Sequence, residues 1–556
     1  MTTSEAAAPK EAVEKAVSPG YRYYVLGILI LIYMLNFLDR QIIGILAAPL
    51  KAEFGLSDTQ FGLLGGLAFA LLYSTLAIPI AWLADRFSRV WIMTAALTVW
   101  SGFTALCGMA GGFASLFLCR MGVGIGEAGG VAPAYSLIAD YFPKSQRARA
   151  LAAYAFGIPL GMAAGTLVGG LLAATWGWRT AFIVVGVLGV LVAPILRLTV
   201  KDPKRGGMDG VSADLADASA TSATERQPLI TPVRAGVMIA VAGAALCASG
   251  FLYGAGVDTG LGFQVANLAR MNTKMLLVMS GAAAFIGGCV IASIGGIRRR
   301  AQRMKPPVVV IAAARSASAS GEAPKAPPFG EVLKTLAPKP SFWLLAFGAA
   351  SSSVCGYGVA AWLPSFFMRS FGLTLSQTAW YYSAIVMVGG VAGIWLGGVM
   401  ADRLGKKSKG AYPLTPAVAF LISVPCFLLA MNSGALVGAV MPGANPNGAA
   451  ALTLAFLIFL IPTGLNLTWL GPITAAVQHL GTPAMRTTAS ALFLLINNLL
   501  GIAVGIYYFG WMSDLLRPTF GEESLRWAIY TGMGFYLLSS ALLFGASRTL
   551  KKDWVD

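Results

Sequence analysis

Long apolar segments recur along almost the whole chain of 556 residues, and they restrict its fold more than any other feature. A helix that crosses a membrane needs about 20 mainly apolar residues. Six such segments run near 23–49, 60–84, 91–112, 114–142, 148–174 and 179–198. Two more lie near 233–253 and 275–297, and a last six lie near 341–369, 375–401, 411–432, 450–480, 486–512 and 525–547. These fourteen segments predict an all-α, multi-pass membrane protein.

The charged residues are few and unevenly placed. They make up only 11% of the chain, whereas a soluble domain carries roughly 25%. With the N-terminus inside, the cytoplasmic loops and tails hold 31 of the 40 Lys and Arg residues, as the positive-inside rule requires. We therefore interpret the net charge of +17 as a topology signal, and we expect no nucleic-acid partner. An even number of spans places both termini in the cytoplasm, and the expected location is a bacterial inner (plasma) membrane.

An internal repeat relates the first six spans to the last six. Residues 54–60 read F-G-L-S-D-T-Q, and residues 371–377 read F-G-L-T-L-S-Q, at an offset of 317. The same offset aligns Asp85-Arg86 with Asp402-Arg403 at the far end of the following helix. Parallel six-helix repeats, related by an axis along the membrane normal, are typical of major facilitator transporters, whose substrate site lies between the halves.

The loops at the end of the repeat strengthen this resemblance. The stretches A-W-L-A-D-R-F-S-R (81–89) and G-G-V-M-A-D-R-L-G-K (397–406) resemble the superfamily's signature loop, G-x-x-x-D-R-x-G-R/K. The first copy departs from it at Ala81 and Ser88. The resemblance implies a cytoplasmic gating latch, whose residues would be Asp85, Arg86, Asp402 and Arg403. A generic turn with cytoplasmic positive charges is the alternative interpretation.

Three further motifs resemble one branch of the superfamily. They read Y-M-L-N-F-L-D-R-Q-I-I (33–43), L-C-R-M-G-V-G-I-G-E-A-G-G-V-A-P-A (118–134) and D-Y-F-P-K-S-Q-R-A-R-A (140–150). Together they are similar to the Spinster branch, and that resemblance implies a proton-linked carrier of lysophospholipids or sphingoid lipids. The N-x-x-D-R and Y-F-P patterns also recur in organic-anion carriers, which leaves that second class of substrate open.

Four charged residues fall inside the first and fourth spans, namely Asp39, Arg40, Arg120 and Glu127. Each costs about 2.5–3.5 kcal/mol at a helix centre, so such residues should face a cavity or each other. Two pairings are open, Asp39 with Arg120 or Glu127 with Arg40. At the repeat offset, Asp39 and Arg40 match Gly356 and Tyr357, so the second half lacks these charges.

The two acids are the candidate proton carriers, because arginine stays protonated. We expect Asp39 and Glu127 to couple proton movement to transport, as the matching positions do in the Spinster family. Arg40 and Arg120 would be charge partners or would bind an anionic headgroup. The alternative is a static ion-pair cluster that joins the two helices.

The predicted organisation has five parts. A cytoplasmic tail (1–22) precedes a first six-helix bundle (23–200), and a central insert (201–340) carries the two extra spans and a basic cytoplasmic loop. A second six-helix bundle (341–548) and a C-terminal tail (549–556) complete the chain.

The expected function is proton-coupled transport of a lysophospholipid or related amphipathic lipid by alternating access of the two halves. The alternatives are a carrier of small organic anions or amphipathic drugs, and a non-transporting membrane sensor. The sequence predicts neither an enzyme nor a cofactor or metal site, since the lone His479 and the six cysteines show no metal-ligand spacing. Protons, membrane lipids and the amphipathic substrate are the expected partners of a monomer.

Overall fold

The computed structural model of the protein describes residues 18–203, 205, 208, 329–405, 408–443, 445–482 and 485–555. These residues form helices, turns and bends and contain no strand. The predicted extra spans at 233–253 and 275–297, and most of the predicted basic loop, lie outside the described residues. Apart from α15 (Phe329–Leu336), which falls in the predicted central insert, the described helices belong to the two predicted six-helix halves.

The chain divides into two compact units. Unit 1 comprises Met1–Ile28, Ser136–Ala153 and Pro203–Ile311, and unit 2 comprises Leu29–Tyr135, Tyr154–Asp202 and Ala312–Asp556. Within unit 1, the beginning of the first helix packs on the turn at 141–143 through edge-to-face aromatic contacts. The domain boundaries expected from the sequence stay a prediction.

The first half of the chain contributes eleven helical elements after residue 18. They are α1 (Pro19–Ile45), α2 (Ala47–Phe54), α3 (Asp58–Gly62), the π-helix η1 (Leu63–Leu67), α4 (Ala68–Ala84), α5 (Arg89–Cys107), α6 (Phe113–Glu127), α7 (Val131–Tyr141), α8 (Lys144–Ala155) and α9 (Gly157–Trp176), followed by α10 (Trp178–Thr199). The predicted span at 114–142 is divided between α6 and α7 by a turn at 128–130.

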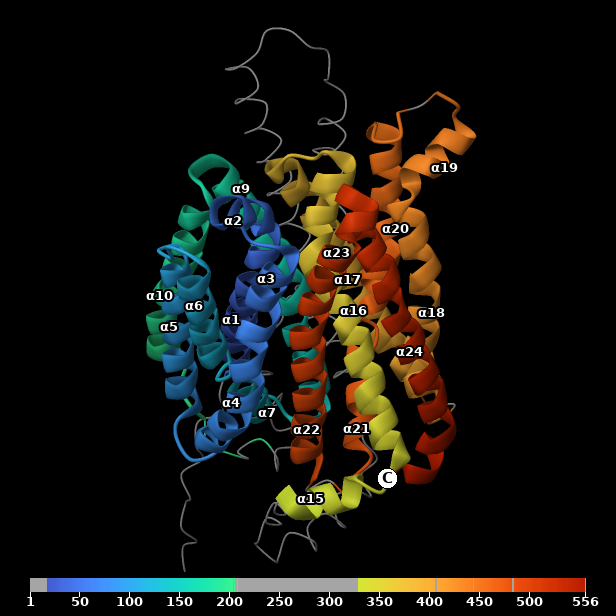
Figure 1. The fold of residues 1–556 in the computed structure, drawn as a ribbon. Coiled ribbons are helices and arrows are strands. Elements are labelled where there is room, and N and C mark those ends of the chain that lie inside the picture. Colours follow the sequence, from blue (N-terminus) through green and yellow to red (C-terminus); the bar gives the residue numbers. More distant parts are fainter. Residues whose placement is uncertain are drawn as a thin grey trace, which may run out of the picture. The chain divides into compact units, whose positions relative to one another are not determined.

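The short helix α15 (Phe329–Leu336) precedes the second half and lies crosswise near one end of α22 (Figure 1). The helical elements that follow are α16 (Pro340–Phe371), α17 (Leu375–Leu404), α18 (Ala411–Met431), α19 (Ser433–Val440), α20 (Ala449–Asn466), α21 (Leu470–Gln478), α22 (Arg486–Asn498), the π-helix η3 (Leu499–Val504), α23 (Gly505–Phe520), the 3-10 turn η4 (Gly521–Glu523) and α24 (Ser524–Asp553).

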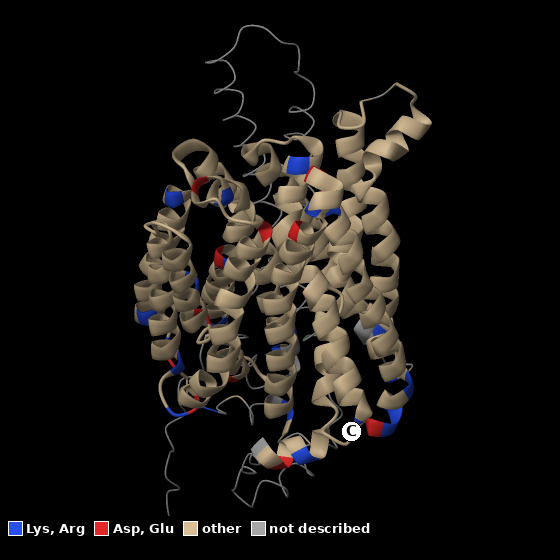
Figure 2. Ribbon diagram, in the orientation of Figure 1, with Lys and Arg blue, Asp and Glu red and all other residues tan. Residues whose placement is uncertain are grey.

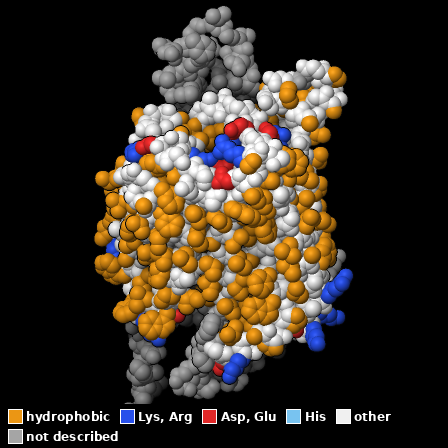
Figure 3. Space-filling model, viewed as in Figure 1, with side chains coloured by type: hydrophobic (Ala, Val, Ile, Leu, Met, Phe, Trp, Pro, Cys, Tyr) orange, Lys and Arg blue, Asp and Glu red, His pale blue; other side chains and the backbone are white. Residues whose placement is uncertain are grey.

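Ten helical stretches of the described residues are long and apolar enough to cross a membrane. One of them, Thr488–Asp553, contains both of the last two predicted spans. On the face that Figure 3 shows, apolar side chains cover a broad band, and charged side chains gather beyond it. Large exposed apolar surfaces of this kind mark contact with a membrane or a partner. Exposed residues of unit 2 include Trp82, Trp91, Leu118, Leu198 and Trp395.

The two copies of the sequence repeat have the same local structure. In each copy a glycine follows a helix in the left-handed conformation, with φ of 63° at Gly55 and 67° at Gly372. Each copy then begins the next helix with a reciprocal capping box, in which a hydroxyl residue and a glutamine bond each other's backbone N–H groups. The pairs are Ser57 with Gln60 and Thr374 with Gln377.

Glycines allow pairs of helices to approach closely in both halves. A Cβ added at Gly161 or Gly165 of α9 would collide with a backbone carbonyl of α1. A Cβ at Gly393 of α17 would collide with the carbonyl of Gly464 on α20. Small residues serve this purpose at helix contacts within membranes, because packing rather than hydrophobic burial drives association there.

We expect a Gly393→Ala variant to be less stable, by about 1–3 kcal/mol, because the new methyl group must push α17 away from α20. The matched control is Gly398→Ala on the same helix, where nothing lies within 4 Å of an added Cβ. Thermal unfolding in detergent should show a lower Tm for Gly393→Ala only. Equal Tm values for the two variants would contradict this account of the helix contact.

Candidate functional site

The four charged residues predicted inside the first and fourth spans lie close together in unit 2. Nε of Arg40 on α1 donates a hydrogen bond of 2.7 Å to Oε2 of Glu127 on α6. Arg120 donates to the backbone carbonyl of Asp39 at 3.4 Å, and no ion pair within the described residues joins their side chains. Of the two pairings left open by the sequence, the structure therefore forms Arg40 with Glu127. Figure 2 shows how sparse charged residues are between the ends of the helices.

The glycines that precede Glu127 explain how α6 reaches this position. In the stretch G-V-G-I-G-E, alternate residues lack a side chain, and neighbouring helices occupy the space. Added Cβ atoms would collide with the Phe103 ring, with the Phe69 backbone carbonyl and with the backbone of Trp100. The glycines concerned are Gly122, Gly124 and Gly126. This close packing brings the following carboxylate into contact with α1.

Asp39 is almost fully buried, with 2% of its surface exposed, and it lies beside the side chains of Trp100 and Thr104. Its Oδ1 atom has no hydrogen-bond partner among the described residues. Glu127 and Arg120 both act on it electrostatically. A buried carboxylate oxygen without a close hydrogen-bond partner is costly in a packed interior, so Asp39 is a candidate functional residue.

A small cavity adjoins this cluster. It has a volume of about 30 Å³, which is room for one or two water molecules, since a cavity needs roughly 10–15 Å³ to hold one. Residues of both halves line it, and they include Arg40, Gln41 and Arg120 of the first half and Tyr357, Ala360, Ile502 and Ile506 of the second. In this conformation the cavity is too small for a lipid.

Aromatic rings hold the Arg40 guanidinium at the cavity. Its central carbon lies 4.4 Å from the centre of the Tyr73 ring and 4.9 Å from the centres of both Phe37 and Phe69. Such cation–π contacts fix a guanidinium while leaving its N–H groups available. Tyr357 also lines the cavity, at the position that the repeat pairs with Arg40. Equivalent positions of the two halves therefore meet at this cavity.

The predicted latch residues lie at the ends of α4 and α17. Asp85 follows the last residue of α4 and is exposed. Arg86 turns back on its own helix, with its guanidinium 3.6 Å from the centre of the Trp82 ring and a hydrogen bond of 3.2 Å to the Trp82 carbonyl. Asp402 and Arg403 fall in the last turn of α17. Within the described residues no ion pair joins Asp85 to the second half, and the latch stays a prediction.

Sequence reasoning missed the partner of the last arginine in the first signature loop. Arg89 is buried at the start of α5, and Asp202, which follows α10, accepts hydrogen bonds from its Nε at 2.9 Å and from its backbone N–H at 2.6 Å. Burial raises the pKa of Asp202, but the hydrogen bonds from Arg89 and Ser88 outweigh it and lower the pKa overall. Asp202 lies in a polar stretch that shows no regular spacing of apolar residues, so no sequence pattern indicated this contact.

The comparisons with known proteins agree with one another. A family model described as Major Facilitator Superfamily matches residues 29–320 and 313–506. An "MFS-type efflux pump" of Mycolicibacterium smegmatis is 26% identical over 539 residues, which cover 97% of this chain and 95% of that protein. "Protein spinster homolog 1" of Homo sapiens is 25% identical over 562 residues, which cover 96% of this chain and 83% of the human protein.

Solved structures show a similar fold. A crystal structure of a bacterial homologue of the human lysosomal transporter Spinster, inward-facing and unoccupied, matches 97% of this chain and 100% of that chain. The TM-score is 0.65 and the sequence identity 26%. The same homologue in an occupied, inward-facing conformation matches with a TM-score of 0.64. These matches show an all-helical major facilitator fold, related to Spinster, in a multi-pass integral membrane protein.

We expect an Asp202→Asn variant to lower the Tm at neutral pH, because buried Arg89 loses charge-assisted hydrogen bonds worth about 1.5–3 kcal/mol. The pKa of Asp202 is lowered in the folded protein. Its stabilisation is therefore present above the ordinary pKa of an aspartate and is lost as the pH falls through the lowered one. Thermal unfolding in detergent should show the difference from wild type shrinking in that acidic range.

The control for this prediction is Asp85→Asn, which removes an exposed carboxylate of the same loop and should leave the Tm unchanged. A difference between wild type and Asp202→Asn that is absent, or that stays constant with pH, would contradict a stabilising role for the Arg89–Asp202 contact.

Proposed function

The chain belongs to the Major Facilitator Superfamily, and from this premise we propose that it is a proton-coupled secondary transporter of lysophospholipids or related amphipathic lipids. The two halves would alternate in opening the central cavity to either side of the membrane. The family points to a transporter rather than an enzyme. The proposed location is a bacterial inner membrane.

The observation that carries the proposal is the buried acid next to the charged residues that line the cavity. Asp39 has an oxygen without a partner, and it adjoins an ion pair between Arg40 and Glu127 that reaches the cavity lining. The arginines stay protonated, so only the two acids can take up and release a proton. A proton on Glu127 would weaken its ion pair with Arg40 and free that guanidinium for a substrate. Proton binding and substrate binding would thereby depend on each other.

The division of polarity between the halves favours an amphipathic substrate. Arg40 and Arg120 are the charged residues of the cavity lining, and both lie on the first half. The second half contributes only uncharged lining residues, and α16, which carries the lining residues Tyr357 and Ala360, also buries the large apolar rings of Trp362, Phe366 and Phe367. An anionic headgroup would be bound by the two guanidiniums, which match phosphate and carboxylate oxygens. The acyl chain would lie toward the second half.

A carrier of small organic anions or amphipathic drugs is the second candidate. The two arginines at a small cavity suit an organic anion, and a relative that spans nearly the whole chain is named an efflux pump. Organic-anion transport would require cationic or hydrogen-bonding groups from the second half as well. In the cavity lining that half supplies Tyr357 as its polar side chain.

Substrate class is tested by uptake in proteoliposomes, with labelled lysophospholipid and a labelled organic acid, each with and without a pH gradient. We expect the gradient to accelerate lysophospholipid movement and to leave the organic acid near the rate of protein-free liposomes. Gradient-driven movement of the organic acid alone would overturn the lipid assignment in favour of the second candidate. Movement of neither compound would remove the support for both substrate classes.

Proton coupling is tested with an Asp39→Asn variant. We expect transport with a pH gradient to fall to the rate seen without one, because the amide cannot take up the proton, whereas exchange of substrate without a gradient should continue. The exchange measurement shows that the variant is folded. The matched control is Glu331→Gln, an exposed carboxylate of α15. Full gradient-driven transport by Asp39→Asn would eliminate Asp39 as the coupling residue.

A further inference from the structure

Two cysteine thiols meet inside the first half, and the proposed transport does not use them. Cys107 is the last residue of α5 and is fully buried, whereas Cys119 lies in the second turn of α6 and is half-buried. Their side chains interact as hydrogen-bond partners. Both residues belong to unit 2, and both are free thiols. The pair is therefore placed for the two sulfurs to react with each other.

The packing of α5 against α6 brings these thiols together. A Cβ added at Gly126 of α6 would collide with the backbone of Trp100 on α5, so the two helix backbones approach closely there. A shift of about two helical turns leads from Gly126 to Cys119 and from Trp100 to Cys107, and it keeps the same faces in contact. The helices run in opposite directions, so this register places the two cysteines opposite each other. A disulfide requires such closeness, since the Cα atoms that it joins lie about 4.4–6.8 Å apart.

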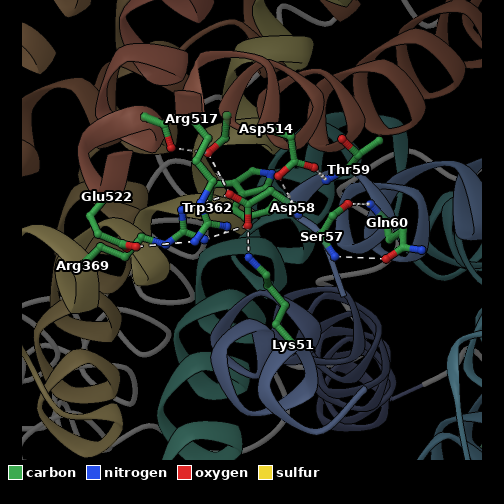
Figure 4. A network of polar contacts seen from close by, with 12 residues as sticks. Lys51, Ser57, Asp58, Thr59, Gln60, Trp362, Arg369, Asp514, Arg517 and Glu522 are labelled. Carbon is green, nitrogen blue, oxygen red and sulfur yellow. Dashed lines mark hydrogen bonds and ion pairs between the residues drawn. The ribbon is translucent and has the colours of Figure 1, made fainter. Parts of the chain in front are cut away.

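The thiol pair lies toward the side of unit 2 that is expected to face away from the cytoplasm. Helices α3 and α4 lead from that side to the first signature loop, and α5 leads back, so Cys107 ends on the side where α3 begins. Figure 4 shows charged residues of that side, where Arg369 of α16 donates hydrogen bonds of 2.7 and 2.9 Å to the carboxylate of Asp58. Disulfides form and persist in compartments outside the cytosol, so this is the side on which a thiol pair meets oxidants.

We propose that Cys107 and Cys119 are a redox-active thiol pair, which a hydroperoxide closes into a disulfide between α5 and α6. The half-buried Cys119 sulfur attacks the peroxide, whose O–O bond breaks and leaves a sulfenic acid on that sulfur. The Cys107 sulfur then forms the S–S bond and displaces the hydroxyl group as water. With hydrogen peroxide, two thiols and one peroxide give one disulfide and two waters. The two electrons that reduce the peroxide come from the sulfurs, and the thiol protons end in the waters.

The disulfide would fix a helix contact that adjoins the charged cluster. Arg120 directly follows Cys119 in α6 and donates to the backbone carbonyl of Asp39. Thr104, one turn before Cys107 in α5, lies beside the Asp39 side chain. A crosslink between the two helices next to these contacts also restricts the unfolded chain, which is the main way in which a disulfide stabilises a protein. Oxidation should therefore stabilise the fold, whatever the substrate is and whether or not protons drive transport.

The test treats the full chain, purified in detergent, with hydrogen peroxide. The remaining thiols are then alkylated in denaturant, and peptide mapping by mass spectrometry locates each disulfide. We expect a link between the peptides that contain Cys107 and Cys119, together with a rise of a few degrees in Tm. Dithiothreitol should reverse both. Absence of the link in the folded protein, or a link from either cysteine to a different one, would overturn the proposal.

Two variants and a matched control separate this pair from the other cysteines. Cys119→Ser should abolish the link and the rise in Tm, and Cys107→Ala, which removes the other thiol, decides the outcome if Cys119→Ser does not fold. The control is Cys426→Ser, because Cys426 of α18 is also half-buried but lies in the second half. It should retain both the link and the rise. A rise in Tm that persists in Cys119→Ser would contradict stabilisation by this disulfide.

Discussion

The cost of placing charge in an apolar interior is the constraint on which the rest of this structure depends. Asp39, Arg120 and Glu127 are nearly unexposed and lie between helices whose outer surfaces are apolar. Such charges persist only where other groups compensate them. The glycines of α6 allow close helix packing, which brings Glu127 to Arg40. Aromatic rings contact the Arg40 guanidinium and compensate part of its charge. Compensation is incomplete at Asp39, whose Oδ1 atom has no close hydrogen-bond partner among the described residues.

Symmetry and its loss are both visible in the two halves. The repeat preserves the left-handed glycine that ends one helix and the capping box that begins the next, because both are local features of the turn between the helices. The side chains that carry charge have diverged. Arg40 corresponds to Tyr357, and Asp58 corresponds to Leu375. The charged chemistry is therefore concentrated in the first half, and the second half supplies an uncharged wall together with the cation Arg369.

Much of the fold and part of the site could be predicted from residues alone. The length of each apolar segment identifies most helices, because a segment that crosses a membrane must form its backbone hydrogen bonds within itself, as a helix does. The four intramembrane charges stand out for the same reason. The Asp202 contact with Arg89 could not be predicted, because it joins residues 113 positions apart without a periodic pattern. The contact between buried Asp58 and Arg369 was hidden similarly, since the two residues lie 311 positions apart. The fourteen-span count and the central insert stay predictions, because the insert lies outside the described residues.

The sequence by itself determined that this protein is helical and crosses a membrane, that its halves are repeats, and that Asp39, Arg40, Arg120 and Glu127 are its unusual residues. Periodicity and local spacing carry that information, since they act between neighbours along one helix. Only the tertiary structure decided that Arg40 pairs with Glu127, that Asp39 keeps a free oxygen, and that Asp58 receives donors from the other half. Adjacent residues on a helix diverge, so the partner of each depends on which helix packs against its face, and no local pattern encodes that choice.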